Sequence, residues 1–412
     1  MLDVAIIGGG AAGFFAAINI KYQHPNLKVA IFEKSKTVLG KVSISGGGRC
    51  NVTHSCFDNS QLISYYPRGN KELLSVFNRF NPQNTIDWFK QRNISLKTES
   101  DGRMFPESNQ SETIINCFLS ECKRLHIPIY TQKPLLDFYS KEDNSFNLVF
   151  ENETVNCNKL VFTSGSSEFM WNMLKKKGVP IIEPVPSLFT FNIKHPLIDG
   201  LQGLSVKKAT VSCAFDKDSL KKHQLKKDQL SQSGPLLITH WGLSGPSVLK
   251  LSSIGARIFN DKNYKFSIIV NWINDSPDNT ILQLKKLKES NSKKKTSNTP
   301  FANLPSRLWE SMCAVLKIET KNWGDLSQNE INKLAGYLTE CSFDVNGKST
   351  FKEEFVTAGG VDLKAIDFKS MESKQIKNLF FAGEVLNIDA LTGGFNFQAA
   401  WSEAWIISQS LS

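Results

Sequence analysis

The N-terminal end of the chain alternates short apolar runs with a segment of helical composition. Leu2 to Ile7 is apolar and ends in a group of glycines, Ala11 to Tyr22 is rich in alanine and large apolar residues, and Lys28 to Phe32 is apolar again. A short apolar run bounded by turn residues is typical of a buried strand, and a longer segment is typical of a helix. The pattern predicts a β-α-β unit.

Helical spacing of apolar residues returns from Asn70 and resumes after Pro82, and a further helix is predicted over Glu112 to Leu125. Strand patterns then follow near 127–130, 135–139, 146–150 and 159–163. The first part of the chain is therefore predicted to be α/β with an antiparallel addition.

The pattern of predicted elements changes after three prolines within 180–186, where short strand-like segments replace the alternation of strands and helices. A polar, lysine-rich stretch over 275–300 and helical patterns over 308–316 and 331–338 come next, and the last sixty or so residues return to strand, glycine turn and helix. The predicted fold class is α/β, a discontinuous Rossmann-like domain with two insertions. We place that domain at 1–186 and 352–412, an inserted β-rich domain at 187–271 and 343–351, and a small helical domain at 272–342.

A glycine fingerprint, Gly8-x-Gly10-x-x-Gly13, follows the first predicted strand and opens the first helix, and Glu33 closes the next strand. Glycines let a backbone approach a pyrophosphate, the helix N-terminus offers unpaired N–H groups, and the carboxylate accepts ribose hydroxyls. A tight strand-helix turn that merely needs small residues is the alternative. The full context favours dinucleotide binding, without separating FAD from NAD.

The C-terminal end repeats this arrangement. A strand pattern over 379–381 ends in Gly383 and Glu384, and Gly393-Gly394-Phe395-Asn396 then opens a helix that runs through Trp405. Such a strand and helix would direct backbone N–H groups at a second part of the ligand. The alternative is a β-α pair that only packs on the sheet.

The formal net charge of +10 and the pI near 9.0 raise the question of a nucleic-acid partner. Much of the excess comes from lysine runs at 207–208, 221–222, 226–227, 285–286 and 293–295, which stand in polar stretches without interleaved aromatic residues. Net charge by itself is evidence about solubility and about the steering of charged ligands, and it is weak evidence for one particular partner. A solvated surface is therefore the favoured interpretation, with nucleic acid left open.

Eight cysteines are scattered without C-x-x-C spacing, which argues against a disulfide scaffold and a zinc site. We expect free thiols in a reducing cytoplasm, and no metal. Outside the glycine-interrupted N-terminus there is no uncharged apolar run of about 18 residues, so no membrane span is expected.

Several longer motifs make the chain resemble the bacterial flavoproteins described as NAD(P)/FAD-dependent oxidoreductases or aminoacetone oxidase family enzymes, within the glutathione-reductase-like two-dinucleotide-binding-domain flavoproteins. The resemblance covers nearly the whole chain. The segments that carry it are Ile6–Gly13, Ser45–Thr53, Gly102–Pro106, Thr239–Pro246, Thr357–Val361 and the C-terminal glycine motif.

The resemblance implies an FAD domain assembled from both chain ends, with Glu33 at the adenosine ribose, the first glycines at the pyrophosphate, and the C-terminal motif at the ribityl chain and isoalloxazine. The residues expected to bind the cofactor are Gly8, Gly10, Ala11, Ala12, Gly13, Glu33, Lys34, Gly48, Arg49, Cys50, Asn51, Leu135, Gly165, Gly383, Glu384, Asp389, Gly393, Gly394, Phe395 and Asn396. The chain departs from the family pattern at Thr163-Ser164-Gly165 and at Asn387, which puts a carboxylate pair with Asp389 in doubt.

Three segments carry possible chemistry. The loop from Ser45 to Asn51 combines glycines with Arg49, which suits an anion, although a flexible glycine loop has the same composition. Cys50 and Cys56 are separated by five residues, where the flavin-coupled disulfides of the related reductases have four, so a catalytic disulfide is disfavoured. His240 is a weak candidate acid or base in a segment where Ser244 would cap a helix and Pro246 would occupy its first turn.

The predicted function is an FAD-dependent oxidoreductase that exchanges a hydride between flavin and a small organic substrate or NAD(P)H. FAD would carry the chemistry while the protein supplies orientation and solvent exclusion. A flavin-dependent RNA-modifying enzyme and a non-catalytic flavin-binding redox sensor are the alternatives. Neither the substrate nor the oligomeric state can be derived from the pattern.

Overall fold

The computed structural model describes residues 1–223, 225–349 and 356–411. The chain divides into two compact units, which we call unit 1, residues 1–184 with 356–412, and unit 2, residues 185–355. The first predicted domain boundary, after residue 186, stands beside this division, and the second, after residue 351, lies outside the described residues. A separate helical domain over 272–342 stays a prediction.

Unit 1 is built on a mixed sheet whose centre is parallel. The parallel part is formed by β1 (Leu2–Ile7), β2 (Val29–Phe32), β6 (Ile129–Tyr130), β9 (Thr154–Phe162) and β21 (Leu379–Phe381). With the antiparallel β19 (Ile366–Asp367) and β20 (Glu372–Ser373), the strands follow the order β19-β20-β21-β9-β1-β2-β6. β9 pairs with β1 on one side and with the C-terminal β21 on the other. The predicted Rossmann-type α/β fold class is confirmed, because one sheet takes strands from both chain ends.

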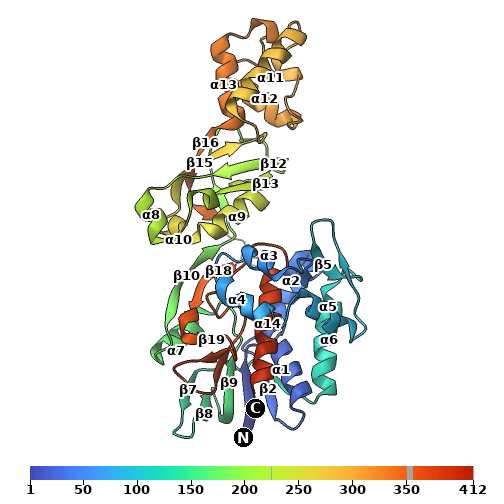
Figure 1. The fold of residues 1–412 in the computed structure, drawn as a ribbon, viewed down its shortest axis with the longest axis vertical. Coiled ribbons are helices and arrows are strands. Elements are labelled where there is room, and N and C mark those ends of the chain that lie inside the picture. Colours follow the sequence, from blue (N-terminus) through green and yellow to red (C-terminus); the bar gives the residue numbers. More distant parts are fainter. Residues whose placement is uncertain (224, 350–355, 412) are drawn as a thin grey trace. The chain divides into compact units, whose positions relative to one another are not determined.

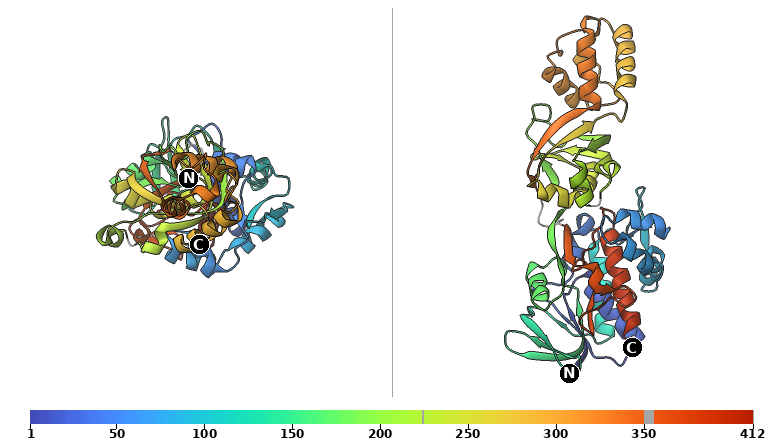
Figure 2. Two further views of the ribbon diagram at one scale, coloured as in Figure 1. Left: turned by 90° about the horizontal axis from the view of Figure 1, so that it is seen from above. Right: turned by 60° about the vertical axis from the view of Figure 1, so that its left-hand side comes forward.

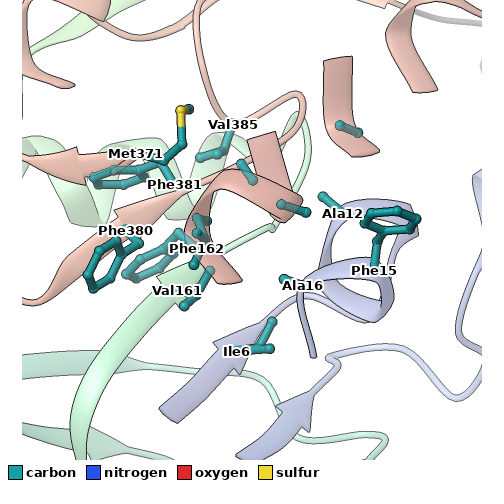
Figure 3. Close-up of a cluster of buried hydrophobic side chains, with 14 of the residues drawn as sticks. Ile6, Ala12, Phe15, Ala16, Val161, Phe162, Met371, Phe380, Phe381 and Val385 are labelled. Atoms are coloured by element: carbon teal, nitrogen blue, oxygen red, sulfur yellow. The ribbon is translucent and has the colours of Figure 1, made fainter. Parts of the chain in front are cut away.

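The helices α1 (Ala11–Gln23) and α14 (Phe395–Ser410) lie side by side in unit 1, where both chain termini are also found (Figures 1 and 2). Both are apolar around most of their circumference, which is typical of a helix buried in a large core. Figure 3 shows Ala16 of α1 on the side of the helix that faces Ile6 of β1, in a cluster with side chains of β9 and β21. The Phe15 ring lies on the other side of α1, where it packs on Trp88 and on Trp401 of α14. The C-terminal helix is therefore part of the central core.

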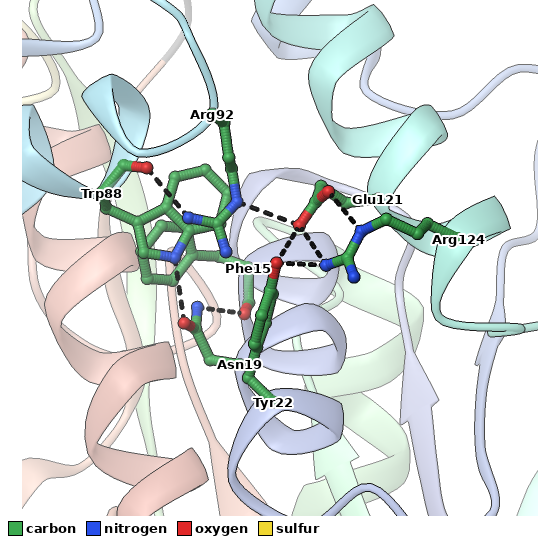
Figure 4. Close-up of polar contacts among 7 residues, drawn as sticks. All are labelled: Phe15, Asn19, Tyr22, Trp88, Arg92, Glu121 and Arg124. Atoms are coloured by element: carbon green, nitrogen blue, oxygen red, sulfur yellow. Dashed lines mark hydrogen bonds and ion pairs between the residues drawn. The ribbon is translucent and has the colours of Figure 1, made fainter.

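A partly buried polar network joins α1 to α5 (Pro82–Lys90) and α6 (Ser111–Arg124), as Figure 4 shows. Trp88 Nε1 donates to Asn19 Oδ1 at 2.9 Å, and Arg92 donates to Glu121 at 3.1 Å while its guanidinium lies 3.5 Å from the Trp88 ring centroid. Tyr22 also donates to Glu121. These contacts satisfy polar groups at the helix interface, where an unpaired one would cost about 1–3 kcal/mol.

The rest of unit 1 consists of short elements around this core. They are α2 (Gly40–Gly48), β3 (Thr53–His54), α3 (Asn59–Leu62), α4 (Asn70–Phe77), β4 (Leu96–Thr98), β5 (Arg103–Pro106), β7 (Asp137–Ser140), β8 (Phe146–Val149), α7 (Glu168–Lys176), β18 (Val356–Val361), β19 (Ile366–Asp367) and β20 (Glu372–Ser373). The helices predicted from residues 70, 82 and 112 and the strands predicted near 129, 138, 147 and 160 all occur among the elements observed.

Unit 2 contains an antiparallel sheet with its own hydrophobic core. The sheet follows the order β16-β15-β12-β13-β14-β11-β17. Its elements are β11 (Thr190–Asn192), β12 (Ser205–Ser212), α8 (Lys217–Lys222), β13 (Ser231–Ile238), β14 (Gly242–Ser244), α9 (Pro246–Ile254), α10 (Ala256–Asp261), β15 (Lys265–Asn271), α11 (Pro277–Ser290), α12 (Ser306–Val315), α13 (Gln328–Thr339), β16 (Cys341–Asn346) and β17 (Lys348–Ser349).

The proline-rich stretch forms a strand, β10 (Ile181–Ser187), which among the described residues pairs with β18 in a two-stranded sheet, an edge position that tolerates proline. One local expectation needs correction. Ser244 does not cap α9, because it is the last residue of β14 and its hydroxyl accepts a hydrogen bond from Thr190. Gly245 occupies the N-cap, whereas Pro246 opens the helix as predicted.

Among the described residues no helix is long and apolar enough to cross a membrane, and no group of side chains has the composition of a metal site. All eight cysteines are free thiols, including Cys50 and Cys56.

Candidate functional site

The three fingerprint glycines have different surroundings. A Cβ at Gly13 would lie 2.0 Å from the carbonyl oxygen of Gly8, and a Cβ at Gly8 would lie 2.4 Å from that of Thr163. A Cβ at Gly10 would meet nothing within 4 Å. Gly8 and Gly13 therefore allow β1, β9 and α1 to pack closely, and Gly10 leaves open space in front of the helix.

The N-terminus of α1 suits an anion. Gly10 is its N-cap and makes no side-chain capping hydrogen bond, and the first turn holds no acidic residue. The N–H groups of Ala11, Ala12 and Gly13 lack intrahelical acceptors, because the first turn of any helix does, and they carry the positive end of the helix dipole. The open space beside Gly10 and these donors fit a pyrophosphate.

Glu33 stands directly after β2 with its carboxylate fixed toward the turn. Its oxygens accept the N–H of Gly9 at 2.7 Å and of Ser35 at 2.8 Å. A carboxylate has about four acceptor positions, so two bonds leave capacity for ribose hydroxyls. Lys34 beside it is exposed, and Leu135 is buried in the core of unit 1.

The segment Ser45–Asn51 bends sharply after the first turns of α2. Gly46, Gly47 and Gly48 all have positive φ, which glycine adopts without strain. Arg49 is not free in this loop, because its guanidinium pairs with Glu99 at 2.6 Å and lies 4.0 Å from the centroid of the Phe105 ring. Contact of Arg49 with a phosphate stays a prediction, and it would compete with Glu99.

Cys50 is fully buried at the end of this loop, and burial raises the pKa of its thiol to about 12. It therefore stays protonated near neutral pH, which does not suit a redox nucleophile. The side chain fills space beside the loop, as a small buried residue does.

The loop after Cys50 joins the N-terminal part of unit 1 to the C-terminal helix. With its amide oriented to satisfy both ends, Asn51 accepts the N–H of Gly394 at 2.9 Å and donates to Thr53 O at 3.0 Å. A Cβ at Gly394 would lie 2.6 Å from Thr53 O, and the φ of Gly394 is 86°. The chain itself therefore requires glycine here, whichever ligand binds.

The segment after β21 lies against the first turn of α1. A Cβ at Gly383 would lie 3.2 Å from that of Ala12, which brings the two glycine motifs together. Glu384 pairs with Lys41, and Asn396 accepts the N–H of Ala390 at 3.0 Å. Gly165, with φ 61°, also faces open space on its Cβ side.

Asp389 has a different environment from the one predicted. It is fully buried, and both carboxylate oxygens accept hydrogen bonds from Arg68. The paired guanidinium holds the carboxylate between the segment before α14 and the segment before α4. Direct contact of Asp389 with a flavin stays a prediction, and the Arg68 pair gives it a structural role.

Two features of the site are absent from the sequence-based prediction. The first is Glu403 of α14, which is fully buried; one oxygen accepts the N–H of Gly383 at 2.6 Å, and the other is buried without a partner among the described residues. Burial raises the pKa of this carboxyl to about 8. A carboxylate in an otherwise apolar helix was the available signal, but only the fold shows that it reaches the Gly383 turn.

The second is an aromatic cluster at the start of α14. Phe395 stacks on Tyr65 at 4.2 Å and on His54 at 4.6 Å between ring centroids. Burial lowers the pKa of His54, and its Nδ1 is buried with no partner among the described residues. This cluster covers Phe395, a predicted cofactor contact, so that its ring is buried by protein.

His240 lies in an exposed turn of unit 2. The structure therefore brings the glycine motifs of both chain ends together in unit 1 and places the weak catalytic candidate in the other unit. Open Cβ positions at Gly10 and Gly165, the free helix N-terminus and the Glu33 carboxylate fit the phosphate and ribose groups of FAD.

Two proteins that align with nearly the whole chain are named as enzymes. The chain is 28% identical over 418 residues to the ribosomal RNA dihydrouridine synthase of Escherichia coli, covering 99% of this chain and 98% of that one. It is 22% identical to the 3-dehydro-bile acid delta(4,6)-reductase of Clostridium scindens, covering 100% and 99%. The 3-ketosteroid-delta4-(5alpha)-dehydrogenase of Rhodococcus jostii superposes with a TM-score of 0.53 at 11% identity, over 100% of this chain and 96% of that one, which shows a shared fold.

The HI0933-like protein Rossmann domain matches residues 2–410, nearly the whole chain. This family and the fold support FAD as the cofactor, in agreement with the open space beside Gly10 at the N-terminus of α1. The chain therefore belongs to the HI0933-like family of Rossmann-fold flavoproteins.

Proposed function

We propose that this protein is an FAD-dependent reductase that saturates a carbon-carbon double bond conjugated to a carbonyl group, and that its substrate is a uridine in ribosomal RNA. The two named relatives support the reaction type. Dihydrouridine differs from uridine by two hydrogens across a ring double bond beside a carbonyl, and the other relative is named as a reductase of a dehydro-bile acid.

The charge of unit 2 is the observation that carries the choice of substrate. Residues 185–355 contain 24 lysines and arginines against 16 aspartates and glutamates, so unit 2 has a formal charge of +8 and unit 1 of +2. Lysine and arginine gain affinity for RNA by neutralising phosphates and releasing counterions. A bile acid carries a single carboxylate and offers much less of this gain than a chain of phosphates, and the charge therefore favours RNA.

Unit 1 would hold the cofactor. Bound FAD would supply and accept the electron pair, and the protein would orient it and exclude water. The N–H groups at the start of α1 would bind the pyrophosphate, and Glu33 would accept ribose hydroxyls. Buried hydrogen bonds from Gly394 to Asn51 and from Gly383 to Glu403 would fix the backbone of the C-terminal half of the site.

The experiment uses the purified full chain. Its chromophore is released by denaturation and identified, and the flavin is then reduced anaerobically and mixed with ribosomal RNA transcribed without modifications. Digestion and mass spectrometry should show a uridine that has gained two hydrogens, with reoxidation of the flavin in proportion. FMN as the chromophore, or reoxidation without dihydrouridine, would contradict the proposal.

A panel of other compounds separates the alternatives. A conjugated steroid ketone tests the bile-acid-like reaction, and aminoacetone with the oxidised protein tests the reaction suggested by the sequence resemblance. NADH and NADPH are added to the oxidised protein in turn to identify the electron donor. A flavin that none of these compounds reduces or reoxidises would favour a redox sensor.

A further inference from the structure

Trp241 stands apart from the other tryptophans of the chain. All eight lie within the described residues; Trp241 is 56% exposed, and each of the others is buried or only partly exposed. One exposed apolar side chain is ordinary on a folded surface, and it indicates a binding site only where its neighbours add recognition chemistry. The residue belongs to the Thr239–Pro246 segment, which the proposed cofactor site does not use.

Hydrogen bonds and a close backbone contact hold the turn that presents Trp241. Thr239 Oγ1 accepts the N–H groups of Trp241 and Gly242, each at 3.2 Å, and Thr239 N donates to Gly242 O at 2.8 Å. A Cβ at Gly242 would lie 2.3 Å from Phe191 O, so the turn is pressed against β11. His240 and Trp241 are consequently held outward at the end of the β13–β14 hairpin.

One basic residue lies beside this turn, and others lie further along the same sheet. Ile193 N donates to Trp241 O at 2.9 Å, so exposed Lys194 directly follows a residue that is hydrogen-bonded to Trp241. On the neighbouring strand β12, exposed Lys207 and Lys208 occupy an irregularity in the pairing with β13. The whole unit carries a formal charge of +8.

We propose that Trp241, with His240 and Lys194 beside it, is a stacking platform for an unpaired nucleotide of RNA. Proteins that bind single-stranded RNA stack bases on exposed aromatic rings while basic groups follow the phosphates. This inference rests on the proposed function and names the surface of unit 2 that receives the RNA.

The surroundings of Trp241 favour RNA over a protein partner. The neighbouring side chains His240 and Lys194 are exposed and polar or basic, and Leu243 points into the core. A protein-binding hot spot is instead surrounded by contacts that exclude water. Charge complementarity therefore selects a polyanion, and the aromatic ring selects one with flat bases.

The test measures binding of a fluorescein-labelled single-stranded RNA of about 12 nucleotides, a length typical of such sites, and of the same strand in a duplex. Trp241→Ala should weaken single-strand binding roughly 5- to 100-fold and leave duplex binding within about 3-fold, and Trp241→Phe should restore most of the loss. Leu282→Ala removes a side chain of matched exposure, 57%, from the same unit and should change neither. Single-stranded RNA should also quench tryptophan fluorescence in the parent and not in Trp241→Phe.

The outcomes separate this inference from the proposed function. Equal binding by parent and Trp241→Ala, with dihydrouridine formed by both, overturns the platform and keeps the reductase. A Trp241-dependent loss of RNA binding in a protein that forms no dihydrouridine keeps the platform and overturns the reductase. Polyglutamate is added as a competitor at the same concentration of negative charges as the RNA. If it displaces the RNA and its own binding depends on Trp241, the surface binds an acidic protein and the proposal of a nucleotide platform is wrong.

Discussion

Unit 1 and unit 2 use charged residues in opposite ways. Unit 1 is close to neutral overall, yet it buries charged or ionisable groups in its core. Examples are Asp389, which pairs with Arg68, and Glu403, which accepts the N–H of Gly383. Unit 2 has a formal charge of +8, and its ion pairs, such as Lys222 with Asp261, lie on the surface. A buried pair fixes backbone geometry, because breaking it leaves an uncompensated charge, whereas surface lysines create a field and little stability.

This contrast predicts which measured properties substitutions in each unit should change. Substitutions in the polar core of unit 1 should alter stability and cofactor binding together. Substitutions on the surface of unit 2 should alter the proposed RNA binding and leave cofactor binding unchanged. Variants of both units test that separation, in decreasing order of the effect we expect.

The largest effect is expected from Gly13→Ala compared with Gly10→Ala. A Cβ at residue 13 would lie 2.0 Å from Gly8 O, so α1 must move from β1 at a cost of about 3 kcal/mol or more. At Gly10 the same methyl group meets nothing, and stability should stay within about 1 kcal/mol of the parent. Urea unfolding and FAD titration measure both. Normal FAD affinity in Gly10→Ala would contradict a pyrophosphate site in the open space beside Gly10.

The next prediction concerns pH and the buried carboxyl of Glu403. Its folded pKa of about 8 lies above the value of about 4.3 in an unfolded chain, so its contribution to stability is fully present below pH about 4.3 and is lost as pH rises toward 8. Glu403→Gln stays neutral and should become more stable than the parent over this range, by up to a few kcal/mol. Urea unfolding at about pH 5 and about pH 8.5 measures the difference.

Glu330 of unit 2 is the control with the opposite sign. The hydrogen bond from Lys321 lowers the pKa of its carboxyl to about 2, so its contribution is present above pH about 4.3 and lost as pH falls toward 2. Because this pair lies at the surface, with its side chains 41% and 22% exposed, Glu330→Gln should cost less than about 1 kcal/mol near neutral pH. The same trend with pH in both variants would refute the contrast between the units.

A smaller, cofactor-specific effect is expected from Glu33→Ala. The change removes the acceptor for the Gly9 N–H and the proposed acceptor for ribose, and FAD binding should weaken by about 1.5–3 kcal/mol. Cys56→Ser alters a buried side chain outside the proposed contacts and should leave FAD affinity close to that of the parent. Dissociation constants from fluorescence titration compare the two. Equal losses would argue against a specific role for Glu33.

The smallest effect is expected from paired lysines. Lys207→Ala with Lys208→Ala should reduce the slope of log affinity against log salt by about 0.7 for each phosphate of a single-stranded RNA that these lysines neutralise. Lys175→Ala with Lys176→Ala removes an equally exposed pair from unit 1 and should leave the slope unchanged. FAD content should be the same in both variants. Equal slopes for both pairs would mean that unit 2 is not the RNA-binding unit.

Gly394→Val is a poor test of the C-terminal cofactor motif, although the sequence favours it. The glycine pattern predicts that a side chain at residue 394 meets the flavin while the fold persists. In the structure its Cβ would instead lie 2.6 Å from Thr53 O, a backbone atom of the protein itself. Such a variant should lose stability as well as FAD, and it cannot report on the cofactor alone.

The order of the elements around the cofactor site follows from the sequence alone. Apolar runs, glycine turns and Glu33 predicted β1, α1 and β2, and Gly393–Asn396 marked the start of α14, because these features depend on a few neighbouring residues. The lysine runs between residues 207 and 295 also showed the basic character of the chain, and all of them lie within residues 185–355 of unit 2.

Which side chains already have partners is known only from the tertiary structure. Arg49 pairs with Glu99, Asp389 with Arg68, and Glu403 with the N–H of Gly383, and each pair joins residues distant in the chain. The exposure of Trp241 likewise depends on how β11 packs against its turn. Local sequence patterns indicate the helix or strand propensity of a segment and the spacing of its apolar residues. The partners and exposures described here arise from packing between segments that are distant in the sequence, which no local window contains.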